Sequence, residues 1–233
     1  MWSLSPAETA ALLLSLKVAF WSVAASLPFA VALAWILSRL SFPGKSLLDA
    51  VVHLPLVLPP VVVGYFLLLT FGRRGPVGAF LDEYLGVTLV FRWTGAALAC
   101  AVMGLPLLVR AVRQSLDAVD RGLEAAAATL GAPPAWVFAS VTLPLILPGI
   151  LTGMLLSFAR SLGEFGATIT FVSNIPGETQ TLPLAIYTFT QVPGGDAQAL
   201  RLCILSIILS LAALMASEIL VRRATVRAAG RDA

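Results

Sequence analysis

The segment WTGAALACAVMGLPLLVRAV, residues 93–112, has one charged side chain, Arg110, in twenty positions. About 20 apolar residues in a helix cross roughly 30 Å of hydrocarbon. This segment is therefore predicted to span a membrane. The whole chain agrees, because 59% of its residues are hydrophobic and only 12% are charged, against roughly 45–50% and about 25% in soluble domains. Both a water-soluble domain and a disordered chain are thereby excluded.

Four further stretches are long and apolar enough to span a bilayer. They cover about Thr9–Leu37, Leu48–Phe71, Leu143–Leu162 and Ala199–Val221. Strands of a membrane barrel would be short and alternating, whereas these runs are continuous. The sequence predicts an all-α polytopic membrane protein with about five transmembrane helices, forming a single domain over residues 1–233.

Charge asymmetry between the loops predicts the orientation. One set of loops and ends holds most of the cations: Arg39, Lys45, Arg110, Arg113, Arg121, Arg222, Arg223, Arg227 and Arg231. The opposite set mixes fewer cations with acids: Arg73, Arg74, Arg92, Asp82, Glu83, Glu178 and Asp196. Because cytoplasmic loops carry the excess of Lys and Arg, we expect the N-terminus outside and the C-terminus inside.

Prolines interrupt the second predicted span. Pro55, Pro59 and Pro60 each remove a backbone donor and bend a helix. A bent span with Gly64 close by suits a helix that lines a path or moves during gating. The alternative is that prolines are simply more frequent in membrane helices.

The longest loop on the predicted cytoplasmic side runs from about 117 to 144, and we call it the lobe. Residues 117–131 are predicted to form a polar-faced helix in which Asp120 and Glu124 lie one turn apart. Gly131 is placed to end it in the left-handed conformation, and Pro133 or Pro134 to open the next helix. An ordinary solvated loop is the alternative, but most connections have about 4–6 residues.

The lobe resembles a known signature. Ala126-Ala127-x-Thr129-Leu130-Gly131, followed after nine residues by Val141-Thr142-Leu143-Pro144, is similar to the "EAA" motif in permease subunits of bacterial ABC importers. The resemblance implies coupling helices that dock into a cleft of a separate ATPase subunit. The family's glutamate falls on Ala125, and Glu124 precedes it by one residue. The residues expected to couple are Asp120, Arg121, Glu124, Ala126, Ala127, Thr129, Leu130, Gly131, Leu143 and Pro144.

Further stretches resemble the oxyanion branch of these permeases, and molybdate permeases most. They are residues 41–45, 53–65, 72–75, 158–168 and 171–179. This resemblance implies a homodimer in the inner membrane that moves molybdate into the cytoplasm, served by a periplasmic binding protein and two ATPase subunits. The same machinery carrying sulfate, thiosulfate or tungstate is one alternative. A secondary transporter without an ATPase is a more distant one.

The resemblance also marks a translocation path and an outer gate over about 163–195. The expected residues are Pro59, Pro60, Gly64, Arg160, Gly163, Glu164, Phe165, Gly166, Ser173 and Asn174. Lys17, Arg160 and Arg201 fall in the outer halves of their spans, where they attract an anion or extend to the interface. Arg160 is expected to pair with Glu164, and Arg201 with Asp196. The alternative for residues 163–195 is a re-entrant segment packed against its own spans.

No catalytic constellation is visible in the sequence. The single histidine, His53, has no partner at metal-ligand spacing, and Cys100 and Cys203 lie in apolar runs. We find no phosphate loop and no hydrolase motif. The chain is expected to be a transport subunit rather than an enzyme, with no metal, no cofactor of its own and no nucleic-acid partner.

Overall fold

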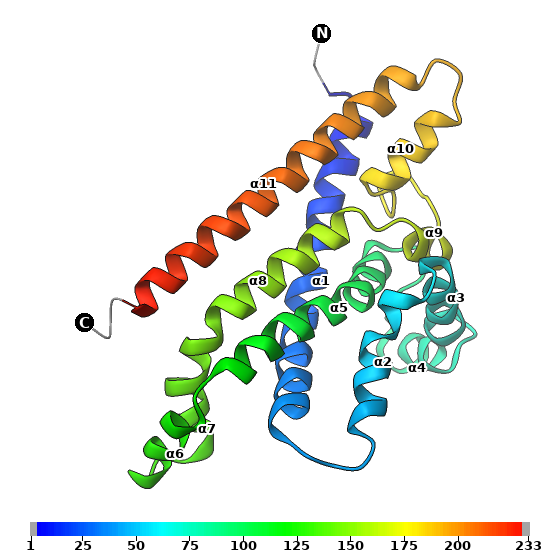
Figure 1. Ribbon diagram of the computed structural model, residues 1–233. Coiled ribbons are helices and arrows are strands. Elements are labelled where there is room, and N and C mark those ends of the chain that lie inside the picture. Colours follow the sequence, from blue (N-terminus) through cyan, green and yellow to red (C-terminus); the bar gives the residue numbers. More distant parts are fainter. Residues whose placement is uncertain (1–3, 230–233) are drawn as a thin grey trace.

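The computed structural model describes residues 4–229, and in its last helix it describes the side chains up to residue 216 and at 219. All of the regular secondary structure in that part of the chain is helical (Figure 1). The elements are α1 (Pro6–Arg39), α2 (Lys45–Val57), α3 (Pro60–Phe71), α4 (Pro76–Leu85), α5 (Trp93–Ala118), α6 (Arg121–Thr129), α7 (Pro134–Val137), the π-helix η1 (Phe138–Thr142), α8 (Leu143–Leu162), α9 (Gly166–Val172), α10 (Leu182–Thr190) and α11 (Asp196–Ala229). The side chains of Arg222, Arg223 and Arg227, and all of Arg231, lie outside the described part.

The centre of the fold is the parallel pair α1 and α5. At one end, the Lys17 ammonium lies 3.8 Å from the centre of the Trp93 ring, a cation–π contact. At the other end, the Ser38 hydroxyl donates to the Asp117 carboxylate. Since both helices run in the same direction, residues 40–92 must carry the chain back along the molecule.

Helix α8 packs antiparallel against this pair. Ser161, near its end, hydrogen-bonds Ser22 of α1 at 3.0 Å, and Ile146, near its beginning, is buried with the last turns of α1 and α5. Glycines bring α8 close to α5: a Cβ on Gly149 would overlap Ser115, and one on Gly153 would lie 3.2 Å from the Leu108 backbone. Small residues at such contacts are typical of membrane helix packing. Helix α11 then runs beside α8 (Figure 1).

Apolar side chains from these helices form two main clusters. One joins α1, α3, α5 and α9, and the other joins α1, α2, α5 and α8 towards the lobe. A smaller cluster holds α10 against α1 and α11. Many large apolar side chains on the outer faces are exposed, among them Phe20, Phe29, Tyr65, Leu200 and Leu211, as expected of helices that face lipid.

In the described part of the chain, four helical stretches are each long and apolar enough to span a membrane, and a fifth span exists if α2 and α3 are taken together. Three of the predicted spans correspond to α1, α5 and α11, which all extend beyond the predicted ranges, α11 by the most, and the fourth coincides with α8. The bend predicted for the second span is present but is a full break: α2 and α3 meet at 114°. Pro59 caps α3 and Pro60 opens it, and neither can donate a backbone hydrogen bond that would continue α2.

Residues 163–195 are more ordered than a loop. They contain α9 and α10, and Phe171, Val172, Leu182 and Leu184 are fully buried. The segment is packed against its own spans, and in this it agrees with the alternative that was predicted for residues 163–195.

The beginning of α1 is held by a polar anchor that the sequence did not reveal. Ser5 and Glu8 form a capping box. The Glu8 carboxylate, 0% exposed, also accepts from Arg201 of α11 at 3.0 and 3.1 Å. The expected pairing of Arg201 with Asp196 is therefore wrong. The sequence separation of 193 residues hides this contact from any local pattern.

This anchor predicts a stability effect. Arg201→Met leaves the buried Glu8 carboxylate without its cation, and we expect a loss of about 2 kcal/mol, less than for a fully buried pair because Arg201 is partly exposed. Thermal unfolding in detergent should shift down by about 4–8 °C. Glu8→Gln in the same chain should recover part of the loss. Asp196→Asn, the matched control, should cost about 0.5 kcal/mol; an Arg201→Met variant as stable as this control would contradict the anchor.

Candidate functional site: the lobe and the 163–195 segment

The lobe consists of three short elements that continue into α8. Helix α5 ends at Ala118, and Asp120 starts α6 by accepting a hydrogen bond from the Gly122 amide at 2.8 Å. The single helix expected over residues 117–131 is therefore two helices, because Asp120 is a strong N-cap residue. After α6 ends, the next three elements form one continuous helical stretch over Pro134–Leu162, made of α7, η1 and α8. A force on the lobe therefore reaches α8 directly.

Gly131 makes the expected left-handed turn. Its φ is +84°, and its amide donates to the Ala128 carbonyl at 3.0 Å. Pro134 opens α7, as predicted from the two prolines. A Cβ at Gly131 would meet no atom within 4 Å, so only the backbone conformation favours glycine there.

The Glu124 carboxylate is bonded to other parts of the same chain. One oxygen of its carboxylate, Oε1, lies 2.9 Å from the Arg39 guanidinium and accepts from the Thr142 hydroxyl at 2.7 Å. Arg39 ends α1, and Thr142 directly precedes α8. Glu124 thus joins α6 to two long helices, and we interpret it as an internal anchor of the lobe.

The opposite face of the lobe exposes apolar side chains. No residue of α6 is buried. Leu130 is 88% exposed, Trp136 57% and Leu123 50%. Arg121, Ala126 and Thr129 are exposed around them and Ala127 is half-buried, while Leu143 and Pro144 lie in the first turn of α8. Exposed apolar groups rimmed by polar ones mark an interaction surface.

At the far end of the molecule, Gly163 ends α8 and a buried carboxylate follows it. Glu164 accepts from the Ala167 amide at 2.8 Å and pairs with the Arg160 guanidinium at 2.7 Å. The predicted Arg160–Glu164 pair is confirmed. It closes the turn between α8 and α9 and satisfies a donor at the start of α9.

Gly64 and Gly166 bring α3 and α9 into close contact. A Cβ on Gly64 would lie 2.6 Å from the Ala167 carbonyl, and one on Gly166 would lie 2.8 Å from the Pro60 side chain. Pro59, one residue earlier, is exposed. Within one chain, both glycines lie at the contact between α3 and α9. This contact links the broken span directly to the 163–195 segment.

The remaining expected gate residues belong to a polar network. The Asn174 side chain donates to the Thr188 hydroxyl at 2.8 Å and accepts from Gln180 at 3.0 Å. Ser173 adopts a φ of +66°, and its carbonyl accepts from the Thr179 hydroxyl at 3.2 Å. The network fixes the connection between α9 and α10. Phe165 packs against Tyr187 with ring centres 5.3 Å apart.

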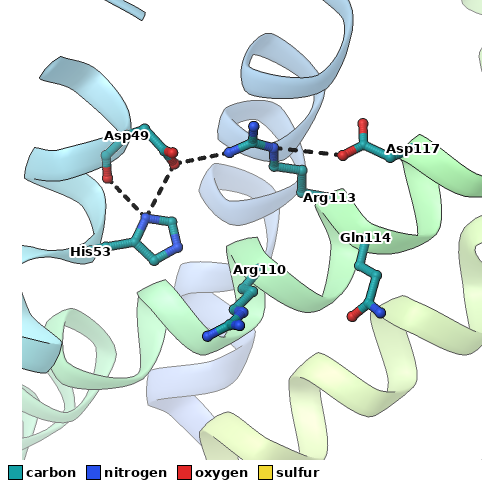
Figure 2. Close-up of a pocket in the computed structure, with 6 residues that line it drawn as sticks. All are labelled: Asp49, His53, Arg110, Arg113, Gln114 and Asp117. Atoms are coloured by element: carbon teal, nitrogen blue, oxygen red, sulfur yellow. Dashed lines mark hydrogen bonds and ion pairs between the residues drawn. The ribbon is translucent and has the colours of Figure 1, made fainter. Parts of the chain in front are cut away.

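A polar cavity between α2 and α5 was not predicted. It has a volume of about 460 Å³ and is lined by Asp49, His53, Arg110, Arg113, Gln114 and Asp117 (Figure 2). The i,i+4 spacings of Asp49 with His53 and of Arg113 with Asp117 were visible in the sequence, but nothing there indicated that the two helices meet. Among the described residues, no group of three or more His, Cys, Asp or Glu side chains is arranged to hold a metal ion.

The parallel and antiparallel apolar helices, the proline-broken span and the lobe define a polytopic helical membrane protein. Residues 26–226 match the family "Binding-protein-dependent transport system inner membrane component", and the chain belongs to this family. It is therefore a membrane-embedded transport subunit.

Individual relatives refine the comparison. The chain is 59% identical over 225 residues, 97% of its length, to the molybdenum transport system permease protein ModB of Escherichia coli strain K12, of which 98% is covered. It is 38% identical to the sulfate transport system permease protein CysT of Salmonella typhimurium, covering 80% of this chain and 67% of that protein. A crystal structure of a bacterial alginate ABC transporter superposes with a TM-score of 0.73 at 17% identity, covering 94% of this chain and 80% of that one, which supports the fold.

The anchor of the lobe can be tested by hydrogen exchange. Glu124→Ala removes the acceptor for Arg39 and Thr142, and we expect the α6 amides to exchange about tenfold faster, equivalent to about 1.4 kcal/mol. Glu83→Ala, at an exposed position in α4, is the control and should leave α6 unchanged. Equal protection of α6 in wild type and Glu124→Ala would show that the contact does not hold the lobe.

Proposed function

We propose that this chain is the translocation subunit of an ATP-driven importer that moves molybdate from the periplasm to the cytoplasm. The observation that carries the proposal is the 59% identity to a molybdenum permease over almost the full length of both chains. The sulfate permease is less similar and is matched over a smaller part of its length. Sulfate, thiosulfate or tungstate as cargo is the second candidate.

The assembly we infer contains two copies of this chain, two ATPase subunits and a periplasmic binding protein. A closed two-fold dimer is the commonest arrangement of identical subunits. Arg39, Arg110, Arg113 and Arg121 lie at or next to the lobe, and this supports an orientation with the lobe in the cytoplasm and the N-terminus outside.

Coupling in this proposal passes through the lobe. The ATPase grips the surface around Leu130, and its closure on ATP draws the two lobes of the dimer together. The continuous helix over Pro134–Leu162 passes this movement to the membrane region, and the Arg39–Glu124 pair passes it to α1. The permease is thereby biased from an inward-facing to an outward-facing state, a ligand-driven shift between two conformations.

The translocation path is proposed to lie between the two copies, near the break of α2 and α3 and beside α8 and α11. The break at Pro59 and Pro60 gives this wall two separate rigid parts, which suits a gate. Its contact with the 163–195 segment through Gly64 links the wall to the expected gate and to the Arg160–Glu164 pair.

Leu130 provides a direct test of docking. Leu130→Asp places a charge where an apolar side chain is to be buried, and we expect at least a tenfold loss of affinity for the ATPase subunit, measured by co-purification and titration in detergent. Leu85→Asp changes an apolar side chain that is 63% exposed outside the lobe and should leave the affinity unchanged. Normal ATPase binding by Leu130→Asp would rule out this docking surface.

Gly131 provides a test of coupling. Gly131→Val forces a β-branched residue to a φ of +84°, which distorts the turn. Molybdate uptake should fall, and so should the stimulation of ATP hydrolysis that accompanies transport. Gly86→Val carries the same change at φ +64° outside the lobe, also without an atom within 4 Å of its Cβ, and should keep both. Wild-type uptake and stimulation by Gly131→Val would disprove the coupling role.

The cargo is tested by uptake into proteoliposomes with the cognate binding protein and ATPase. We expect ATP-dependent accumulation of labelled molybdate that a hundredfold excess of sulfate does not inhibit. Sulfate accumulation at the molybdate rate would favour the second candidate. Accumulation without ATP would indicate a secondary transporter instead.

A further inference from the structure

We propose that the cavity between α2 and α5 is a weak binding site for a tetrahedral oxyanion, at which the cargo is held before its release on the lobe side. The inference rests on the proposed function for the identity of that oxyanion. The site itself is argued from the side chains that line the cavity.

Both carboxylates of the cavity have partners within the protein. Asp49 lies 3.0 Å from the Arg113 guanidinium and 3.3 Å from His53 Nδ1. Asp117 lies 3.8 Å from Arg113 Nε and accepts from the Ser38 hydroxyl. Figure 2 shows Arg113 between the two acids. The acids therefore position Arg113 and offer little to a cation.

The donors left for a ligand come from the other side chains. The guanidinium of Arg110 and the amide of Gln114 lie beside the cavity, and no side chain drawn in Figure 2 bonds to either. The Nδ1 atom of His53 contacts Asp49, whose backbone carbonyl lies 2.8 Å away. The second ring nitrogen of His53, Nε2, is therefore free to face a ligand. Guanidinium groups match the paired oxygens of oxyanions.

The position of Arg110 strengthens the argument. Arg110 is the only charged residue of the twenty-residue segment 93–112. It lies near the lobe end of that segment, so a fixed positive charge there attracts an anion on its way to the lobe side. Its side chain is exposed at the cavity and is accessible to a ligand.

The balance of charge in the cavity suits release. Two arginines face two carboxylates, so the net attraction for an anion is modest. A conduction site must attract its ion but also let it go. The cavity also joins moving parts, because His53 lies shortly before the break at Pro59, and Asp117 lies where α5 meets the lobe.

The test uses the permease–ATPase complex in nanodiscs, without binding protein or nucleotide. Equilibrium dialysis with labelled molybdate should show saturable binding in the wild type, and tungstate and sulfate are tested as competitors. Arg110→Gln should weaken binding at least tenfold, and Arg110→Lys should retain part of it. Lys45→Gln, which removes a cation at the start of α2 outside the cavity, is the matched control and should bind as wild type. Co-purification of the ATPase checks that each variant is assembled.

The outcomes separate this inference from the proposed function. Unchanged binding by Arg110→Gln, or no saturable binding in a wild type that imports molybdate, overturns the site and leaves the function intact. Binding of sulfate in preference to molybdate, lost in Arg110→Gln, supports the site and overturns the proposed cargo. Equal losses in Arg110→Gln and Lys45→Gln would indicate a general charge effect and would also overturn the site.

Discussion

The parallel packing of α1 and α5 is the constraint on which the rest of the structure depends. These helices are held in register from the Lys17–Trp93 contact to the Ser38–Asp117 bond. Because α1 and α5 run in the same direction, the chain must return between them. A single straight helix does not make that passage; α2 and α3 do so with a 114° break. The antiparallel α8 then fills the remaining face of the pair.

Three ion pairs of this protein lie at or near helix ends. Glu8 with Arg201, Glu124 with Arg39, and Glu164 with Arg160 each tie a helix terminus to another element. The chain has 15 Lys and Arg and 12 Asp and Glu residues, and these three pairs use six of them. Apolar packing against lipid has little directional preference, whereas a buried ion pair fixes one arrangement, and these pairs therefore define how rigid parts are connected.

The lobe combines an inner face that is tied down with an outer face that is not. Glu124 is held by two partners, while Leu130 extends into solvent at 88% exposure. The proposed coupling needs both properties: an exposed apolar group for a partner to bind, and a firm attachment to the membrane helices. The continuous helical stretch through η1 to α8 supplies the second attachment.

Much of the fold followed from the sequence by itself, because apolar runs of bilayer length, prolines and a glycine stop act locally. These features predicted the membrane class, four of the spans within a few residues, the bend at Pro59 and Pro60, and the turn at Gly131. The pair of Arg160 with Glu164 was accessible for the same reason, since it lies within one helical turn.

Only the tertiary structure decided which distant groups meet. It replaced the expected Arg201–Asp196 pair by Arg201–Glu8, turned Glu124 inward towards Arg39, and brought α2 beside α5 to enclose the cavity at Arg110. The physical reason is that the residues in each contact are separated in the sequence by between 64 and 193 positions. Helix packing determines which of these distant residues meet, and no periodic pattern in the sequence predicts those contacts.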